Sequence, residues 1–213
     1  GVHATYYDLG SFGNQSGRHV SRILPIFNVD TGMTFERNAN LFGNAYLQTL
    51  EPRLFYNYIP TKSQNDLPNF DTSENSFSYN QLFRENLYVG NDRINSANSL
   101  TAAVQTRFFN PNNGAELFRA GIGQKFYFKN DKVLLDGSVG RYERSQSDWV
   151  GFAHGKLSNS IHAGFDVHYN QNESRAESYA ATIRYNPEPG KVLSARYKYG
   201  RNERIYLQSD GNY

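Results

Sequence analysis

The sequence predicts an all-β chain, an antiparallel up-and-down transmembrane β-barrel of which about nine or ten strands are present. Apolar and polar residues alternate along successive segments with the period of a strand that faces lipid on one side and water on the other. Clusters of Asn, Pro, Gly, Ser and Asp separate these segments and are typical of turns. The 16 Tyr, 15 Phe and 18 Gly suit strands and turns. No apolar run approaches the ~20 residues that a spanning helix needs.

Two strands are expected before residue 60. Residues 20–36 carry apolar side chains at one parity, and residues 47–59 end on an aromatic run. Pro25 and Pro52 lie inside these segments, and each removes one backbone N–H from the ladder. We therefore expect a bulge, a strand end or locally weak pairing at both prolines.

Residues 60–98 interrupt the alternation, because they are polar and rich in Asn and Ser. Loops of this length are uncommon in compact domains and are usually functional or disordered. Outer-membrane barrels place their long loops outside and their short turns in the periplasm. We therefore place residues 60–98 outside, or folded back into the lumen, with 47–59 running outward and 99–109 running inward.

The same alternation continues to residue 199. In residues 161–169 every odd position is apolar or aromatic, and every even position is polar or glycine. Similar patterns predict the remaining strands, which cover residues 99–109, 116–128, 133–143, 149–157, 161–169, 178–185 and 191–199. Long strands joined by short turns in an unbroken order favour a barrel over a Greek-key sandwich.

The composition restricts the function. The formal net charge of +2 has no long block of either sign, so nothing favours nucleic acid. The absence of cysteine removes disulfides, thiol nucleophiles and thiolate metal sites from this stretch. The first residues lack the pattern of a secretory signal, so either a signal was removed or the chain begins within a longer protein.

No catalytic constellation stands out, and no G-x-S-x-G motif is present. The residues His19, His154, His162 and His168 are scattered along the expected strands, where solvated lumen-facing side chains explain them better than a metal site. We therefore expect no enzyme activity, no cofactor and no metal.

Three motifs point to a family. The string QTLEPR occupies residues 48–53, LFR occupies 82–84 and DRI occupies 92–94. In this order the motifs resemble the LPS-assembly outer-membrane protein family (LptD, also called Imp or OstA). The motif-rich part covers somewhat under half of the chain. Beyond Arg107 the chain resembles the family in its strand architecture, most clearly at residues 121–128.

The resemblance implies a very large barrel of about 26 strands, near the upper end of the usual range. In the family a periplasmic β-jellyroll precedes the barrel, and a lipoprotein (LptE) plugs its lumen. Lipopolysaccharide (LPS) arrives along a periplasmic bridge (LptA) and leaves through a lateral opening between the first and last strands. This sequence lacks the jellyroll, the full strand set and the family's cysteines.

We therefore expect residues 1–213 to be a partial barrel domain, from the internal to C-terminal barrel portion of such a protein. A partial barrel exposes two open strand edges, which lipid does not tolerate, so alone it should not be a functional pore.

The leading functional hypothesis is a non-enzymatic translocon in the outer membrane of a Gram-negative bacterium, which transports LPS and inserts it into the outer leaflet. The alternative is a general diffusion porin or another outer-membrane receptor, which the strand pattern alone permits and the motifs disfavour. A soluble or secreted β-protein is a third class, and it would stay folded and monomeric without detergent.

Two sets of residues are candidate sites. The first lies in the long loop and either contacts the lipoprotein plug, as the resemblance favours, or staples the loop to itself: Leu82, Phe83, Arg84, Asp92, Arg93 and Ile94. The second is basic and lies on the faces assigned inward: Arg107, Arg119, Lys125, Arg184, Arg196 and Lys198. Arginine binds phosphate bidentately, so the second set is a candidate surface for conducting or orienting anionic glycolipid. Solvation of an aqueous lumen explains the same charges, and both interpretations stay open.

Overall fold

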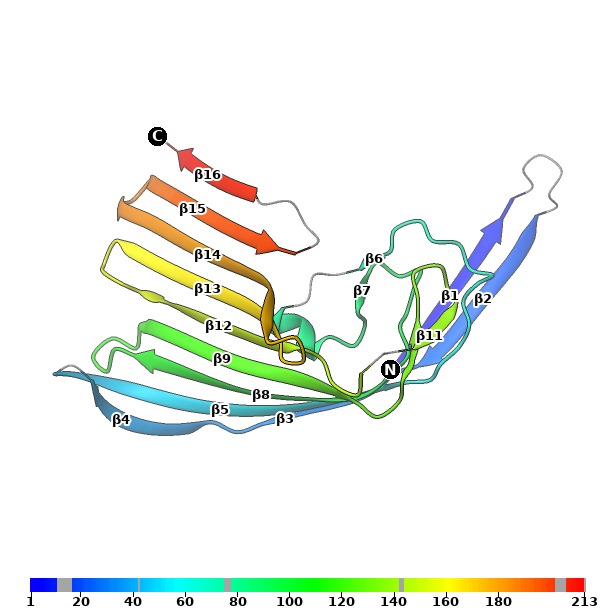
Figure 1. The fold of residues 1–213 in the computed structure, drawn as a ribbon, viewed down its shortest axis with the longest axis horizontal. Coiled ribbons are helices and arrows are strands. Elements are labelled where there is room, and N and C mark those ends of the chain that lie inside the picture. The colour runs from blue at the N-terminus through cyan, green and yellow to red at the C-terminus, as the bar shows by residue number, and fades with distance from the viewer. Residues whose placement is uncertain (11–16, 42, 75–77, 142–143, 202–205, 213) are drawn as a thin grey trace.

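A computed structural model describes residues 1–10, 17–41, 43–74, 78–141, 144–201 and 206–212, without the side chains of Arg18 and of 206–212. Figure 1 shows a large sheet, with smaller hairpins and loops gathered beyond one of its ends. The strands of the large sheet are β3 (Phe27–Gly32), β4 (Phe35–Leu41), β5 (Asn44–Ile59), β8 (Ala97–Phe109), β9 (Glu116–Tyr127), β12 (Trp149–Lys156), β13 (Ile161–Asn170), β14 (Arg175–Glu188), β15 (Lys191–Gly200) and β16 (Tyr206–Asn212).

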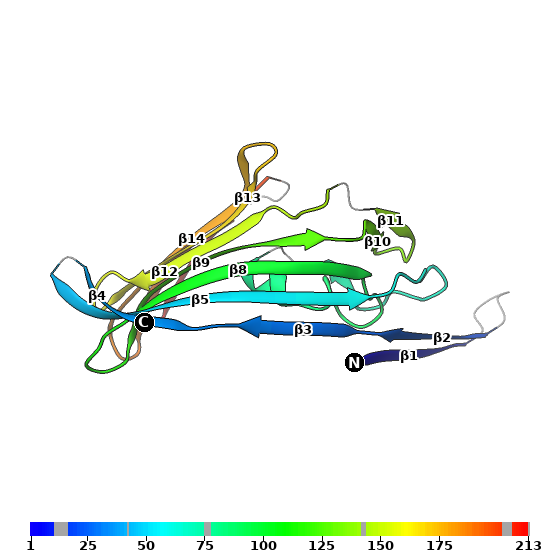
Figure 2. The same ribbon diagram turned by 90° about the horizontal axis from the view of Figure 1, so that it is seen from below.

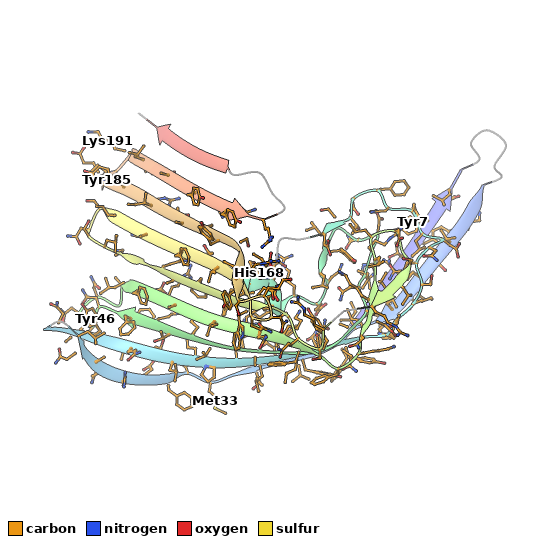
Figure 3. All side chains as sticks on the ribbon, viewed as in Figure 1. Tyr7, Met33, Tyr46, His168, Tyr185 and Lys191 are labelled. Atoms are coloured by element: carbon orange, nitrogen blue, oxygen red, sulfur yellow. The ribbon has the colours of Figure 1, made fainter. Side chains whose placement is uncertain are left out.

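The large sheet has ten strands, and neighbouring strands pair antiparallel in the order β16-β15-β14-β13-β12-β9-β8-β5-β3, with β4 also on β5. From β4 onward, strands of this sheet that follow one another along the chain are neighbours in it, and β3 pairs with the part of β5 that β4 leaves free. Figure 2 shows the sheet bending as it runs from β3 to β14. The predicted fold class, an all-β antiparallel portion of an up-and-down barrel, is confirmed.

The two faces of this sheet differ in chemistry. One face, here the outer face, exposes large apolar side chains from every part of the sheet, which include Leu54, Ile122, Phe165, Ile183 and Leu193. The opposite face, here the inner face, carries most of the charged and polar side chains and is partly covered by a short 3-10 helix, η1 (Tyr79–Phe83). An apolar outer face and a polar inner face are the arrangement of a barrel wall that faces lipid on one side and a lumen on the other.

The two ends of the sheet also differ. Tight turns join β4 to β5, β8 to β9 and β14 to β15 at one end, here the turn end, and each contains a glycine with positive φ: Gly43, Gly114 and Gly190. The long connections 60–96 and 128–148 leave from the other end, here the loop end. Among the residues that the structure describes, no helix is long and apolar enough to cross a membrane.

The structure corrects the strand expected over residues 133–143. Instead, β10 (Asp131–Val133) and β11 (Val139–Arg141) form a small hairpin, and β12 pairs directly with β9. Residues 142–143 lie outside the described residues. The physical reason is the Asp136-Gly137 turn, in which Gly137 has a φ of 91° and divides the segment into two pieces too short to span. Every later strand consequently runs opposite to the expected direction, and the turn after β12 lies at the turn end.

The chain before β3 also differs from expectation. β1 (Val2–Leu9) pairs with β2 (Arg18–Pro25) in a two-stranded hairpin beyond the loop end. The single strand expected over residues 20–36 is therefore divided, because its first part belongs to β2 and its second part to β3 and β4, which continue to residue 41. The expectation for the two prolines is confirmed. Pro25 ends β2, and Pro52 lies where β5 changes partner from β3 to β4, with its carbonyl accepting from the Met33 N–H at 3.1 Å.

Because its two faces differ, the sheet predicts unequal effects on stability when the same substitution is made at two adjacent residues. Val104 lies on the outer face near the middle of β8, and Gln105 lies on the inner face and donates to the Glu51 carboxylate at 3.0 Å. In the full-length protein in lipid, Val104→Arg should lower the free energy of unfolding by about 2–4 kcal/mol, because a buried cation faces hydrocarbon. Gln105→Arg should change it by about 0.5 kcal/mol or less, because the new cation lies beside Glu51. Urea titration measures both, and equal effects would contradict the assignment of the faces.

Candidate functional site: the inner face and the loop folded onto it

The 60–96 connection folds back onto the inner face of the sheet. Figure 1 shows its helical turn, η1, lying against the middle strands on the hollow side. The Thr101 hydroxyl on β8 donates to the Leu82 carbonyl at 2.7 Å, and the Leu82 side chain is fully buried. A Cβ at position 123 would lie 2.8 Å from Leu82 Cδ1, so glycine at this position of β9 makes the close approach feasible.

Aromatic contacts hold η1 on the inner face. The Phe83 ring lies 6.4 Å from the Phe55 ring, and the Arg53 guanidinium lies 4.0 Å above the Phe83 centroid. Arg53 is itself fixed by Asp30 on β3, because its Nε donates to Asp30 Oδ1 at 2.9 Å. These geometries match an edge-to-face aromatic pair and a cation–π contact, which add to the burial of apolar area.

The residues after η1 reach the edge of the sheet. Asn57 on β5 donates from its side-chain amide to the Glu85 carbonyl at 2.8 Å, and Asn28 on β3 donates to the Glu85 carboxylate. Arg84, between η1 and this anchor, is exposed. The connection therefore crosses the inner face from β12 to β3 before it returns to the loop end.

Asp92 accepts the hydrogen bonds that hold the connection in place where it returns to the loop end. Its carboxylate accepts from the Tyr7 hydroxyl at 2.5 Å and from the backbone N–H groups of Phe70 and Asp71 at 2.5 and 2.9 Å. Burial alone would raise the pKa of Asp92, but the hydrogen bonds outweigh it and lower the pKa to about 2. Burial, and next the hydrogen bond to Asp92, raise the pKa of Tyr7 to about 12.

Two buried arginines complete this polar junction. Arg22 on β2 donates to Gln64 Oε1 and to the carbonyls of Asp92 and Asn91 at 2.5, 2.7 and 2.7 Å. Arg93 donates to the carbonyls of Leu67, Pro68 and Leu135 at 2.7, 2.9 and 2.9 Å. A buried guanidinium without such acceptors would be costly, so the two arginines lock the loop, the β1–β2 hairpin and the β10–β11 hairpin into one arrangement.

The predicted loop residues divide into two groups. Leu82, Asp92, Arg93 and Ile94 are buried within the chain itself, and Ile94 packs with Leu24 and Ile59. These four residues staple the loop to the hairpins and the sheet, which is one of the two interpretations that the sequence left open, and their contact with a partner stays a prediction. Phe83 is half-buried and Arg84 is exposed, so these two keep surface for a partner.

The predicted basic residues differ in how they are paired. Arg107 lies 3.4 Å from Glu51 and 3.7 Å from Glu116, and Arg119 lies 3.7 Å from Glu116. Lys125 lies on the inner face but is only 3% exposed under the folded loop, so its predicted contact with LPS stays a prediction that would require this loop to move. Lys198 is half-buried, and Arg184 and Arg196 are exposed on the inner face.

Sequence reasoning missed the junction residues outside the motifs, namely Tyr7, Arg22 and Gln64. Two signals pointed toward the junction. The alternation of residues 2–7 matches a strand, and Arg22 shares the inward parity of its strand. Two of the expected inner-face histidines are paired with acids, since His154 lies 3.3 Å from Asp166 and His168 lies 2.9 Å from Asp148.

Comparison with known proteins identifies close relatives. The family model described as LptD: LPS transport system D matches residues 1–213. The LPS-assembly protein LptD of Neisseria meningitidis serogroup A is 67% identical over 213 residues, which are 100% of this chain and 27% of that protein. The proteins of the same name from Azoarcus sp. strain BH72 and Chromobacterium violaceum are 43% and 41% identical, over 95% and 100% of this chain and 25% and 26% of their own length. The chain spans about a quarter of the length of these relatives.

The junction predicts a local effect of Asp92→Asn in the full-length protein. The amide offers one acceptor oxygen in place of two, so one donor among Tyr7, Phe70 and Asp71 is left unsatisfied inside the protein. We expect the local free energy of opening of residues 60–96 to fall by about 1–3 kcal/mol. Hydrogen exchange of these residues measures this, with Glu74→Gln in the same loop as the exposed control. Unchanged exchange in Asp92→Asn would contradict the role of the carboxylate.

The lowered pKa of Asp92 predicts how the junction responds to acid. Its stabilising contribution is fully present above the ordinary Asp pKa of about 3.9 and is lost as the pH falls through about 2. Pepsin cleavage within residues 60–96 should therefore stay slow from pH 4 to pH 3 and accelerate near pH 2. Asp92→Asn should lack this step, and a wild-type step near pH 4 would contradict the assignment.

Proposed function

The chain belongs to the LptD family, and on that premise we propose that it forms part of an outer-membrane barrel that transports LPS and inserts it into the outer leaflet of a Gram-negative bacterium. The match of the LPS transport system D model to residues 1–213 carries this proposal. The apolar outer face and polar inner face support it, because they fit a wall between lipid and an aqueous lumen. We propose transport without enzymatic chemistry.

The general-porin alternative is not retained. The matching family model and the relatives described above are named for LPS transport or assembly, not for diffusion of small solutes. The folded loop also supports this choice, because η1 and the residues after it occupy part of the inner face where a diffusion channel would be open.

We propose two protein partners from the family resemblance. A lipoprotein plug (LptE) would contact the surface that the folded loop presents on the inner face, with Phe83 and Arg84 as the accessible residues. A periplasmic bridge protein (LptA) would bind through a domain that lies in another part of the full-length protein. The buried loop residues would position this contact surface.

Depletion of the full-length protein tests the proposed function. When its synthesis is switched off, the amount of LPS at the cell surface should fall. Newly made LPS should then accumulate within the cell, on the inner side of the outer membrane. Re-expression should restore the surface LPS. If surface LPS stayed constant while uptake of small solutes fell, the porin alternative would replace this proposal.

The partner proposal predicts an effect of Arg84→Ala. The substitution removes an exposed cation from the loop that covers the inner face, and it disturbs no described hydrogen bond of the junction. We expect less lipoprotein plug to co-purify with the full-length barrel, while the heat-modifiable mobility of the barrel is unchanged. Arg37→Ala, an exposed arginine near the turn end, is the matched control. Equal plug recovery from both variants would contradict a role for Arg84.

A further inference from the structure

Three depressions follow one another along the inner face, from the turn end to η1. The first is lined by Glu116, Arg119, His154, Lys156 and His162. The second is lined by Arg119, His154, Asp166, Thr182, Arg184 and Arg196. The third lies between η1 and β12–β15 and is lined by Tyr79, Asn80, Asp166, His168, Arg196 and Lys198. Because consecutive depressions share residues, they form one continuous trough.

The trough carries an excess of positive charge. Its lining contains the cations Arg119, Lys156, Arg184, Arg196 and Lys198 against the carboxylates Glu116 and Asp166. The carboxylates are already engaged, since Glu116 lies near Arg107 and Arg119, and Asp166 lies 3.3 Å from His154. An anion in the trough would therefore meet cations whose charge is only partly neutralised.

Arg196 occupies the central position in this trough. It lines both the second and the third depression, and it is exposed. Within the described part of the chain, neither Arg196 nor its neighbour Arg184 has an ion-pair partner. A guanidinium in this state has a full set of donors for an incoming phosphate or carboxylate.

The third depression adds groups that fit a sugar. Tyr79 and Asn80 of η1 lie on one side, and Asp166, His168 and Ser178 on the strands line the other. Tyr79 is held in place, because its ring packs edge-to-face against Phe152 at 4.8 Å and Phe83 at 5.5 Å. Several hydrogen-bonding groups around one aromatic ring and one guanidinium match a ligand that has hydroxyls, a ring face and an anionic group.

We propose that the depression between η1 and β12–β15 is a binding site for a phosphorylated saccharide, in which Arg196 binds the phosphate and Tyr79 and Asn80 contact the sugar. The proposal rests on the proposed function in one respect, because LPS would supply a saccharide of this kind. A free phosphorylated oligosaccharide has the same chemistry and is the second source. The site lies at the end of the trough, so η1 would hold the saccharide before it leaves the inner face.

Binding to the full-length protein in detergent tests the site. The probes are the phosphorylated oligosaccharide released from LPS by mild acid, the same oligosaccharide after phosphatase treatment, and inorganic phosphate. Arg196→Gln should weaken binding of the phosphorylated form about tenfold and leave the dephosphorylated form unchanged. Arg196→Lys should give a smaller loss, because the charge remains but the bidentate geometry is gone. Tyr79→Ala should weaken both saccharides by the same factor.

Arg141→Gln, an exposed arginine on the β10–β11 hairpin, is the matched control and should bind like wild type. Heat-modifiable mobility shows that each variant is folded. If folded Arg196→Gln binds both saccharides as wild type does, or if inorganic phosphate binds as tightly as the oligosaccharide, the proposed site is wrong.

A photo-crosslinker at position 80 distinguishes LPS from a free oligosaccharide as the source of the ligand. It also distinguishes failure of the proposed site from failure of the proposed function. Capture of intact LPS in vesicles supports the site and LPS as its ligand. Capture of the free oligosaccharide alone supports the site and assigns it the second source. If depletion lowers surface LPS but position 80 captures neither, the site is overturned and the proposed function stands.

Discussion

Hydrocarbon offers no partner for a backbone N–H or C=O, and for the proposed barrel wall in lipid this constraint organises the whole sheet. Each strand of the large sheet between its two edges, β16 at one end and β3 and β4 at the other, pairs on both sides, so the interiors of these strands need no water for their backbone hydrogen bonds. Side chains then alternate between two faces, and a slip of one residue would exchange them. The apolar outer face and the polar inner face therefore fix the register of the strands, and irregular backbone is confined to the ends and the inner side.

The folded loop depends on that division. Because the inner face is polar, it offers the loop partners such as Thr101 and Asn57, and the small Gly123 leaves room for Leu82. The loop in turn carries its own buried charges, and Arg22, Asp92 and Arg93 are each surrounded by several hydrogen-bonding groups. Arg22 Nε is the one atom of these three side chains that is buried without a partner in the described part of the chain, and a buried network that is otherwise satisfied favours one arrangement. The loop is consequently a defined wall of the inner face, and both proposed ligand surfaces depend on where this wall places η1.

The local pattern of the sequence predicted the strands whose two faces differ, and it failed where long-range contacts decide. Residues 161–169 alternate strictly, and β13 covers Ile161–Asn170. Residues 133–143 also alternate in part, but the Asp136-Gly137 turn and contacts of Leu135 and Val133 with Arg93 and Tyr88 draw residues 131–141 into a hairpin. For the candidate site, parity placed Arg184 and Arg196 on the inner face. The apolar character of Leu82 and Ile94 indicated either a partner or a staple within the chain, but no local signal showed which distant residues would bury them.

The most direct test of the central claim is the accessibility of spin labels placed one at a time along positions 100–108 of the full-length protein in lipid vesicles. We expect labels at even positions to collide with dissolved oxygen in the lipid, because Leu100, Ala102 and Val104 share the outer face. Labels at odd positions should be shielded from oxygen, and those near Thr101 should be shielded from water-soluble reagents as well, because η1 covers them. A profile without alternation, or one with the opposite parity, would contradict the assignment of the two faces and of the loop that folds onto one of them.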